Sequence, residues 1–269
     1  MKSVIVSVVL YRHSLEKVLP TINSILSSDV VKRLILVDNS DCQWARKMGD
    51  PRVVYVKSSS NQGYGHGHNQ AINKFAAESD YYLVCNPDVE FSSDVLKKLI
   101  EVAEQCPAGL FMPAISNADG SRQEVCRLLP TPLDSFVRRL LPAAARWTSK
   151  NYLLQNADFS CTFFAPSLSG CFMFFRKEAL LALKGFDERY FMYFEDVDLS
   201  RRAAEQFGAV YVGGVSILHH FEQSSYKNNR MFFLHIKSAC QYFLKWGWFF
   251  DPGRRRLNKI CLEGLPVKQ

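Results

Sequence analysis

The feature that most constrains the fold of this chain is the alternation of short apolar runs with segments of helical periodicity. The runs are dominated by Val, Ile, Leu and Tyr, as expected for strands buried on both faces. Strands are predicted at residues 4–10, 33–37, 52–56 and 81–85, and helices at residues 15–26, 69–78 and 94–105. This order favours an α/β fold with a Rossmann-like, mainly parallel, doubly wound sheet between flanking helices.

The second half of the chain continues the pattern less regularly. Further strands are predicted at residues 171–175, 209–212 and 215–218, and a further helix at residues 197–206. From residue 116 to residue 166 prolines interrupt the pattern, which indicates an insertion in the sheet scaffold.

Polar residues follow two of the predicted strands. Asp38 ends the second strand, and Asn86-Pro87-Asp88 follows the fourth. Ligands of open α/β sheets bind beyond the carboxyl ends of the strands, so we expect Asp38 and Asp88 to lie in one crevice. Asp38 could accept a hydrogen bond from a nucleobase or a ribose, and Asp88 suits Mg²⁺ or Mn²⁺ shared with a substrate diphosphate. Both could instead be plain turn residues.

The composition indicates a basic protein but does not determine which class of partner it binds. The chain has 269 residues, a net charge of +7 and a pI of about 9.0, which suits nucleic acid, an anionic membrane or a phosphorylated substrate. Its eight cysteines include no Cys-x-x-Cys pair, so reduced thiols in the cytosol are expected and structural zinc is not. The apolar N-terminus is interpreted as a strand, not a signal peptide, and no stretch has the length of a membrane span.

A glycine-rich segment precedes the second predicted helix. Gly63, Gly65 and Gly67 alternate with other residues between Asn61 and Asn69. We expect residues 61–67 to form a loop whose backbone N–H groups approach phosphate oxygens at the start of a helix. The segment matches neither the dinucleotide-binding fingerprint nor a P-loop, and its two histidines leave a metal site as a second interpretation.

An acidic cluster is the strongest candidate for chemistry. Glu195, Asp196 and Asp198 lie beside the aromatic residues 190–194 and before two arginines. Carboxylates beside so much apolar surface are costly to desolvate unless they are paired or used. Asp196 and Asp198 point to different sides of a helix, so they should have different roles, Asp198 supporting the helix or an arginine. Simple stabilisation of a helix N-terminus is the alternative.

Two adjacent histidines, His219 and His220, follow the last predicted strand. Neighbouring strand residues face opposite sides, so at most one of them should enter the site. That histidine could complete a metal shell, and a surface pair is the alternative.

The order of these motifs resembles the family 2 glycosyltransferases of GT-A fold, in particular the bacterial rhamnosyltransferase-like branch. The resemblance covers residues 1 to about 225. The motifs that carry it are Asp38, Asn61-x-Gly63 with Asn69, Asn86-Pro87-Asp88, Gly170-x-x-Met173-x-x-Arg176, Gly185-Phe186-Asp187-Glu188 and Glu195-Asp196-x-Asp198-Leu199.

The resemblance implies a role for each matched residue. Asp196 would be the catalytic base of an inverting transfer, and Asp88 with His219 (or His220) would bind a divalent metal, Mg²⁺ or Mn²⁺. The first position of the family's Asp-x-Asp motif is Asn86 here. The substrate-binding residues would be Tyr11, Asp38, Asn61, Gly63, Asn69, Asn86, Gly170, Arg176 and Glu195. We expect either Arg176, Arg201 or the metal to offset the negative charge near the base.

The resemblance also implies the substrates. The donor would be a nucleoside-diphosphate sugar, with thymidine-diphosphate rhamnose favoured. The acceptor would be a hydroxyl of a lipid-linked glycan or polysaccharide in bacterial surface glycan synthesis, of the O-antigen or capsule type. The region 116–166, to which Arg138, Arg139 and Arg146 add charge, is expected to face this acceptor.

Two segments are expected, a nucleotide-sugar-binding catalytic domain at residues 1–225 and a helical C-terminal extension at residues 226–269. The extension is rich in Phe and Trp and carries Arg254-Arg255-Arg256. It is interpreted either as an amphipathic helix on an anionic membrane surface or as a helix packed on the sheet. The expected location is cytoplasmic, at the inner membrane surface in the first case.

Two other classes of function fit the sequence less well. A sugar nucleotidyltransferase would need a glycine-rich Arg/Lys loop after the first strand, where this chain has Leu10-Tyr11-Arg12-His13. A non-enzymatic nucleic-acid-binding protein would need longer basic runs or a recognition motif. We therefore expect no nucleic-acid partner.

Overall fold

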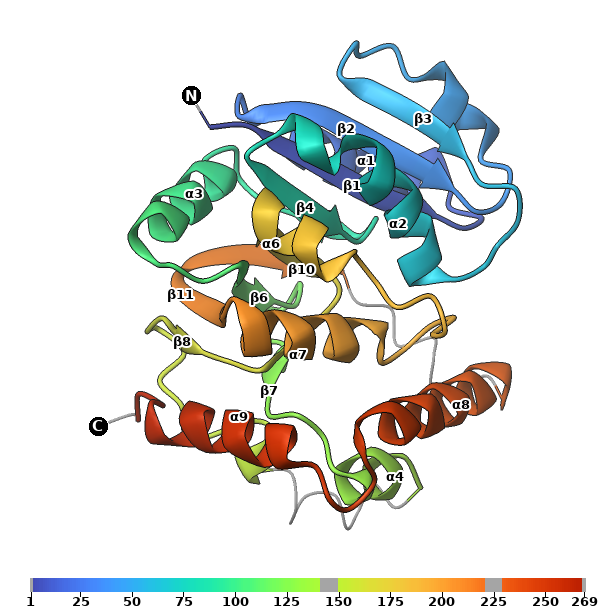
Figure 1. The fold of residues 1–269 in the computed structure, drawn as a ribbon. Helices are drawn as coiled ribbons and strands as arrows, with labels where there is room; N and C mark the ends of the chain where they lie inside the picture. Colours follow the sequence, from blue (N-terminus) through green and yellow to red (C-terminus); the bar gives the residue numbers. More distant parts are fainter. Residues whose placement is uncertain (1, 141–149, 221–228, 268–269) are drawn as a thin grey trace.

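The computed structural model describes residues 2–140, 150–220 and 229–267, with the side chains of residues 137–140 and 229 left out. A central sheet runs through the molecule and helices cover both of its faces (Figure 1). Its strands in spatial order are β3 (Val53–Lys57), β2 (Val31–Asp38), β1 (Val4–Leu10), β4 (Tyr81–Cys85), β10 (Phe172–Arg176), β6 (Leu110–Ser116), β11 (Ala209–His219) and β5 (Val89–Glu90), and β8 (Phe163–Phe164) also pairs with β11.

The expected helices are present, and two helices that were not predicted, at Pro132–Leu140 and Lys177–Leu183, join them. They are α1 (Leu15–Leu26), α2 (Tyr64–Phe75), α3 (Val95–Gln105), α4 (Pro132–Leu140), α6 (Lys177–Leu183), α7 (Glu195–Gln206), α8 (Asn229–Trp246) and α9 (Pro252–Glu263), with short 3₁₀ turns η1 (Gln43–Lys47) and η2 (Ala76–Glu78). A separate two-stranded ribbon joins β7 (Cys126–Arg127) to β9 (Ser167–Leu168). The predicted α/β fold with flanking helices is confirmed.

The sheet is mixed, because β10 and the short strands β5 and β8 run opposite to the other strands. Strands β3, β2, β1 and β4 are parallel, as are β6 and β11, whereas β10 is antiparallel to both of its neighbours. Strands β1 and β4 are buried along their whole length, which explains their uninterrupted apolar sequence. The reversal brings the start of β10 to the carboxyl end of β4, where Phe172 pairs with Cys85.

The glycine-rich segment is helical, which corrects the expected loop over residues 61–67. Helix α2 begins at Tyr64, and the N–H of Gly67 donates to the carbonyl of Gly63 at 3.2 Å. Gly67 packs against β1 so closely that a Cβ there would lie 2.9 Å from the Val9 side chain. This glycine therefore allows a helix to approach the sheet, and its amide is used within the helix.

Strand β11 also differs from expectation, because the two predicted strands at 209–212 and 215–218 form one strand. The pairing with β6 is irregular between Val212 and Ser216, so a bulge separates the two apolar runs.

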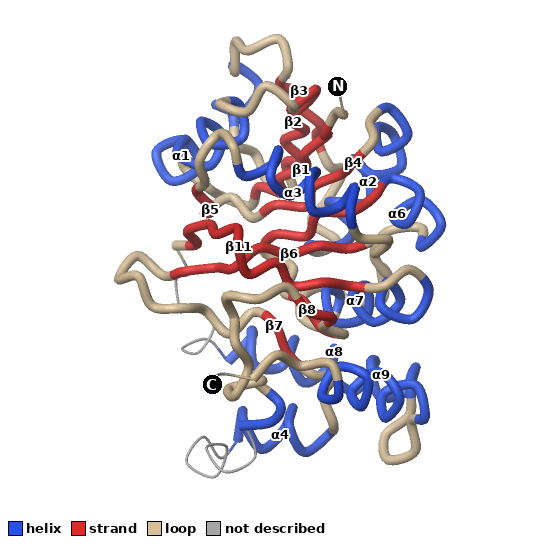
Figure 2. The backbone as a smooth tube through the Cα atoms, turned by 90° about the vertical axis from the view of Figure 1, so that its left-hand side faces the viewer, coloured by secondary structure: helices blue, strands red, loops and turns tan. Residues whose placement is uncertain are grey.

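Helices α4, α8 and α9 gather at one end of the molecule, beyond the sheet edge formed by β11 and β8 (Figure 2). A second apolar cluster there joins Tyr190 and Phe194 to Ala239, Tyr242 and Phe243 of α8. At least this part of the extension packs against residues that precede it, beside the start of α7. The predicted boundary at 225/226 and the residue Arg146 lie outside the described residues, as do the side chains of Arg138 and Arg139.

Among the described residues, no helix combines the length and the apolar character that crossing a bilayer requires.

Candidate active site

The candidate site is a row of polar residues at the carboxyl edge of the sheet. Asp196 lies at one end of the row, and Asp88 with His219 lies at the other. Tyr64 and Asn86 connect them, because the Tyr64 hydroxyl is 2.7 Å from the carbonyl oxygen of Gly170 and 3.0 Å from Oδ1 of Asn86. The row forms because four elements meet here. Strands β4 and β11 end at this edge, and β10 and α7 begin at it.

Asp196 has the environment of a general base. Its Oδ2 accepts from the amide of Gly170 and its Oδ1 from that of Val197, both at 2.9 Å. Burial raises the pKa of Asp196, although these amides and the nearby guanidinium of Arg127 act in the opposite direction. A carboxylate with a raised pKa accepts a proton more readily, which suits the removal of a proton from a hydroxyl.

The neighbouring Glu195 differs from Asp196 in exposure. Its side chain is buried, and its Oε2 accepts no hydrogen bond from the described residues. Burial, with the charge of Asp196 as a second cause, raises the pKa of Glu195 well above its ordinary value. Glu195 is therefore held in its neutral form more strongly than Asp196, and Asp196 is the member of the pair that carries charge.

The backbone before α7 is strained. Tyr193 and Phe194 both have positive φ angles, 68° and 66°, although neither is glycine. Each such residue costs about 1–2 kcal/mol, and strain of this kind gathers at functional sites. Helix α8 holds the turn, because Ser238 Oγ donates to the carbonyl of Met192 at 2.8 Å and Phe194 packs against the ring of Tyr242.

Asp198 supports the helix, as the sequence predicted. It is fully buried, and its Oδ2 accepts a hydrogen bond from Nε of Arg202 at 2.8 Å. Lys245 Nζ and Trp246 Nε1, both from α8, lie 2.6 Å and 2.8 Å from its Oδ1. Asp198 thus joins α7 to α8 and takes no place in the polar row.

Asp88 and His219 form the part of the row that fits a divalent cation. Oδ1 of Asp88 is buried, accepts no hydrogen bond from the described residues, and lies 3.2 Å from Nε2 of His219. An oxygen and a nitrogen that share one cation are held at about this separation, since each lies roughly 2.0–2.2 Å from the metal. No third His, Cys, Asp or Glu joins them among the described residues, so oxygens of a bound substrate would complete the shell.

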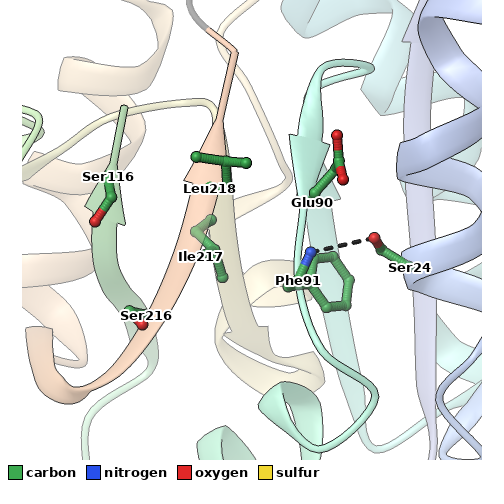
Figure 3. A pocket seen from close by; sticks show the side chains of 7 residues that line it. All are labelled: Ser24, Glu90, Phe91, Ser116, Ser216, Ile217 and Leu218. Carbon is green, nitrogen blue, oxygen red and sulfur yellow. Dashed lines mark hydrogen bonds between the residues drawn. The ribbon is translucent and has the colours of Figure 1, made fainter. Parts of the chain in front are cut away.

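The structure also separates the two histidines. His219 is buried beside Asp88, whereas Nε2 of the exposed His220 lies 2.6 Å from Oε1 of Glu90. Glu90 lies at a cavity of about 400 Å³ between β5 and β11 (Figure 3). The cavity is lined by Ser24, Glu90, Phe91, Ser116, Ser216, Ile217 and Leu218 and lies outside the polar row. His219 is therefore the candidate ligand.

The residues predicted from the sequence to contact a nucleotide, Tyr11 and Asp38, lie at the ends of β1 and β2. Asp38 is fully buried, and its oxygens accept from the amides of Ser40 and Cys42 at 2.9 Å and from the Tyr55 hydroxyl at 2.8 Å. Burial alone would raise the pKa of Asp38, but these hydrogen bonds outweigh it and hold the pKa below its usual value. Asp38 thus shapes the loop after β2, and its contact with a base stays a prediction. Tyr11 is exposed after β1, where it could reach a nucleotide.

Asn61 and Gly63 shape the entry to α2. Oδ1 of Asn61 accepts from the amide of Gly63 at 3.1 Å. Gly63 has a φ of +110°, and a Cβ there would lie 2.1 Å from the carbonyl oxygen of Phe191. The pair therefore allows the aromatic segment before α7 to lie against the start of α2, beside Tyr64.

Two predicted substrate-binding residues lie elsewhere. Arg176 pairs with Tyr81 at the opposite edge of the sheet, because β10 is antiparallel, and its guanidinium donates to the carbonyls of Ala103, Cys106 and Ala108. Asn69 is buried, and its amide bonds both the N–H and the C=O of Phe186 at 2.9 Å. Both side chains therefore hold the scaffold in this structure, and contact of either residue with substrate stays a prediction.

Three site residues were missed from the sequence: Tyr64, Arg127 and Gln123. Tyr64 lay within the singled-out segment but carried no periodic signal. Arg127 comes from β7, in the region of weak pattern, and replaces Arg176 and Arg201 as the expected positive neighbour of Asp196. Gln123 contacts His219 from the same region, and nothing local in the sequence marks it.

Sequence comparison identifies the class of protein to which this fold and polar row belong. Residues 3–183 match Glycosyl transferase family 2, so this chain belongs to that family. It is 32% identical over 195 residues to the N-acetylglucosaminyl-diphospho-decaprenol L-rhamnosyltransferase of Mycobacterium tuberculosis, covering 65% of this chain and 61% of the relative. It is 26% identical over 246 residues to the rhamnosyltransferase WbbL of Escherichia coli K12, covering 86% and 88% of the two chains.

Solved structures confirm the GT-A fold. The mannosyltransferase PcManGT from Pyrobaculum calidifontis, in complex with GDP-Man and Mn²⁺, superimposes with a TM-score of 0.61 at 15% identity, over 96% of this chain and 68% of that one. GalNAc-T7 with UDP, GalNAc and Mn²⁺ gives 0.61 at 11% identity, over 83% and 44%. The predicted resemblance to family 2 is thus confirmed. The chain spans about three fifths of the length of the mycobacterial relative.

Proposed function

We propose that this chain is an inverting glycosyltransferase. It moves a sugar from a nucleoside-diphosphate donor to a hydroxyl of a lipid-linked glycan or polysaccharide in bacterial surface glycan synthesis, of the O-antigen or capsule type. The observation that carries the proposal is the polar row, with Asp196 at one end and the pair Asp88 and His219 at the other. A base and a cation site at one sheet edge suit a single displacement at an anomeric carbon, in which one group accepts a proton and the other stabilises the leaving diphosphate.

The reaction follows from this placement. The acceptor oxygen forms a bond to the anomeric carbon while the bond from that carbon to the diphosphate oxygen breaks, and Asp196 takes the acceptor proton. Attack from the face opposite the leaving group inverts the anomeric configuration. A divalent cation, Mg²⁺ or Mn²⁺, bound by Asp88 and His219 would stabilise the negative charge of the departing diphosphate.

Rhamnose is the favoured sugar. Two relatives are named rhamnosyltransferases, and one of these names includes a diphospho-decaprenol substrate. They support L-rhamnose as the transferred sugar and a lipid-linked acceptor. Thymidine-diphosphate rhamnose is our proposed donor. The titles of two structural neighbours include Mn²⁺, which supports a metal in this fold. Binding of a panel of nucleotide sugars, measured by calorimetry with and without Mn²⁺, tests this choice, and a preference for another sugar would contradict it.

The role of Asp196 is tested by Asp196→Asn. We expect sugar transfer to fall about 10²–10⁴-fold while donor binding persists, because the amide keeps the size of the side chain but cannot accept the proton. Glu178→Gln is the matched control, since the Glu178 side chain is 72% exposed on α6. Near-normal transfer by the asparagine variant would show that another group removes the proton.

A membrane partner is the remaining part of the proposal. Phe249 and Phe250, between α8 and α9, are 82% and 75% exposed, and Arg255 and Lys259 lie beside Phe249 around a cavity of about 570 Å³. Exposed aromatic residues beside basic ones suit an anionic lipid surface. We therefore place the protein at the cytoplasmic face of the membrane that carries its acceptor, and its eight free thiols suit that reducing compartment. No nucleic-acid partner is proposed.

A further inference from the structure

We propose that Gln123 is a positioning residue that fixes the tautomer and orientation of His219, so that Nε2 of the ring is presented to a divalent cation shared with Asp88. The inference rests on the proposed function, in which Asp88 and His219 hold that cation. Gln123 comes from the segment between β6 and β7, far in sequence from both proposed ligands.

The amide of Gln123 has only one orientation that satisfies its neighbours. Its Nε2 donates to the backbone carbonyl of His219 at 2.8 Å and to Oδ1 of Asn117 at 2.7 Å. The carbonyl of His219 can only accept, so exchanging the nitrogen and oxygen of the amide would lose this bond. Oε1 therefore faces the ring, 2.9 Å from Nδ1 of His219.

This orientation sets the protonation of the imidazole. An amide oxygen can only accept a hydrogen bond, so Nδ1 of His219 carries the hydrogen. In the neutral ring the lone pair then lies on Nε2, which is 3.2 Å from Oδ1 of Asp88 and 3.4 Å from Nδ2 of Asn86. Metal-binding histidines commonly donate their other ring nitrogen to a neighbouring oxygen in this way.

The loop that carries Gln123 is held in place by its own hydrogen bonds. The amide of Gln123 donates to the carbonyl of Ile115 at 2.8 Å, and the amide of Asn117 donates to the carbonyl of Ser121 at 2.8 Å. The Asn117 side chain bonds the Ser121 hydroxyl at 2.8 Å. Gln123 is thus fixed before any ligand arrives, and its contact with His219 forms part of the folded site.

Gln123→Leu tests the inference, because leucine has a similar size but neither accepts nor donates. We expect the full-length variant to bind Mn²⁺ about 10–100-fold more weakly than the unchanged protein, measured by electron paramagnetic resonance without donor. Gln105→Leu is the matched control, since Gln105 is exposed at the end of α3. Unchanged Mn²⁺ affinity in Gln123→Leu would overturn the inference.

The tautomer provides a second measurement. In a ¹⁵N-histidine-labelled sample the imidazole spectrum should show His219 as the Nδ1–H form, and Gln123→Leu should introduce the Nε2–H form. The signal is assigned by its loss in His219→Ala.

Gln123→Glu keeps an acceptor for Nδ1–H, so it should retain the tautomer and bind Mn²⁺ more tightly than Gln123→Leu. Equal loss in both variants, or an Nε2–H ring in the unchanged protein, would refute the role. If Gln123→Leu does not fold, the imidazole spectrum of Gln123→Glu tests the role instead. The Nδ1–H form supports the role of Gln123, and the Nε2–H form refutes it.

Failure of the inference can be told from failure of the proposed function. His219→Ala and Asp88→Asn should each weaken Mn²⁺ binding at least as much as Gln123→Leu. If neither does, the proposed cation site is wrong. If both do and Gln123→Leu does not, only the role of Gln123 is wrong.

Discussion

Asp196 and Asp198 lie on one helix, two residues apart, and meet opposite environments. Asp198 faces Arg202, Lys245 and Trp246, and its charge is neutralised inside the protein. Asp196 faces the sheet edge, where main-chain amides and one guanidinium oppose the effect of burial on its pKa. Helical geometry alone predicts that the two side chains diverge. It does not predict that the cation near Asp196 is Arg127, because that residue arrives through the β7–β9 ribbon.

Arg127→Gln should therefore alter the pH dependence of transfer. Loss of the positive charge raises the pKa of Asp196 further, so less of the ionised base exists at a given acidic pH. The acid limb of kcat/KM should move to higher pH. Arg122→Gln is the control, since Arg122 is exposed in the same region and stacks on Phe159. An acid limb that stays in place or moves to lower pH would contradict the electrostatic role of Arg127.

At the scale of elements, the C-terminal helices complete the setting of α7. Arg201 of α7 and Asp251, which precedes α9, form a buried pair with two contacts of 2.7 Å. Both side chains are 2% exposed, so neither charge can be solvated by water if its partner is lost. Helix α8 adds the contacts to Met192, Phe194 and Asp198 that hold the strained turn before Glu195. Removing these helices should therefore disturb α7 itself.

Asp251→Asn tests this dependence. We expect it to lower the free energy of unfolding by about 3 kcal/mol, because Arg201 would keep a buried charge with only the more distant carboxylate of Glu205 near it. Lys259→Ala is the control within the same region, since the Lys259–Glu263 pair is exposed on α9 and should contribute less than about 1 kcal/mol. Urea unfolding followed by circular dichroism measures both variants. Equal, small effects would mean that the C-terminal helices dock only loosely.

At the scale of the whole molecule, the sheet edge that carries the site and the end that carries α4, α8 and α9 are joined through α7 (Figure 1). The outer face of α8 exposes Phe233 and Leu244, and the turn after it exposes Phe249 and Phe250. A protein held by this end would keep its strand-edge site close to the lipid surface. This arrangement suits an acceptor that is itself anchored in lipid.

The double variant Phe249→Ser/Phe250→Ser should lose membrane affinity. Each exposed phenylalanine can contribute about 1.5–3 kcal/mol when it leaves water, so binding to phosphatidylglycerol vesicles should weaken at least about tenfold. Leu181→Ser on α6 is the control, because that side chain is exposed far from this turn in the fold. Co-sedimentation with anionic and with zwitterionic vesicles measures the effect. If the unchanged protein sediments with neither, the membrane proposal fails.

The sequence by itself determined the features that depend on neighbours along the chain. Continuous apolar runs require buried strands, apolar residues at helical spacing require packed helices, and their alternation requires an α/β sheet. Polar residues directly after strands, Asp38 and Asp88, could therefore be assigned to one edge. The motif order extended this to a family, which the match to residues 3–183 confirmed.

The tertiary structure alone decided the features that depend on strand direction and on contacts between distant segments. The reversed strand β10 placed Gly170 in the site and Arg176 at the far edge, and no periodicity records direction. The glycine-rich segment is helical from Tyr64, and Gly67 lets this helix pack closely on β1. Burial distinguishes His219 from His220. Gln123 forms a hydrogen bond with His219 although 96 residues separate them in the sequence. Local patterns report which face of an element is apolar, whereas a hydrogen bond between distant side chains exists only once the whole chain has folded.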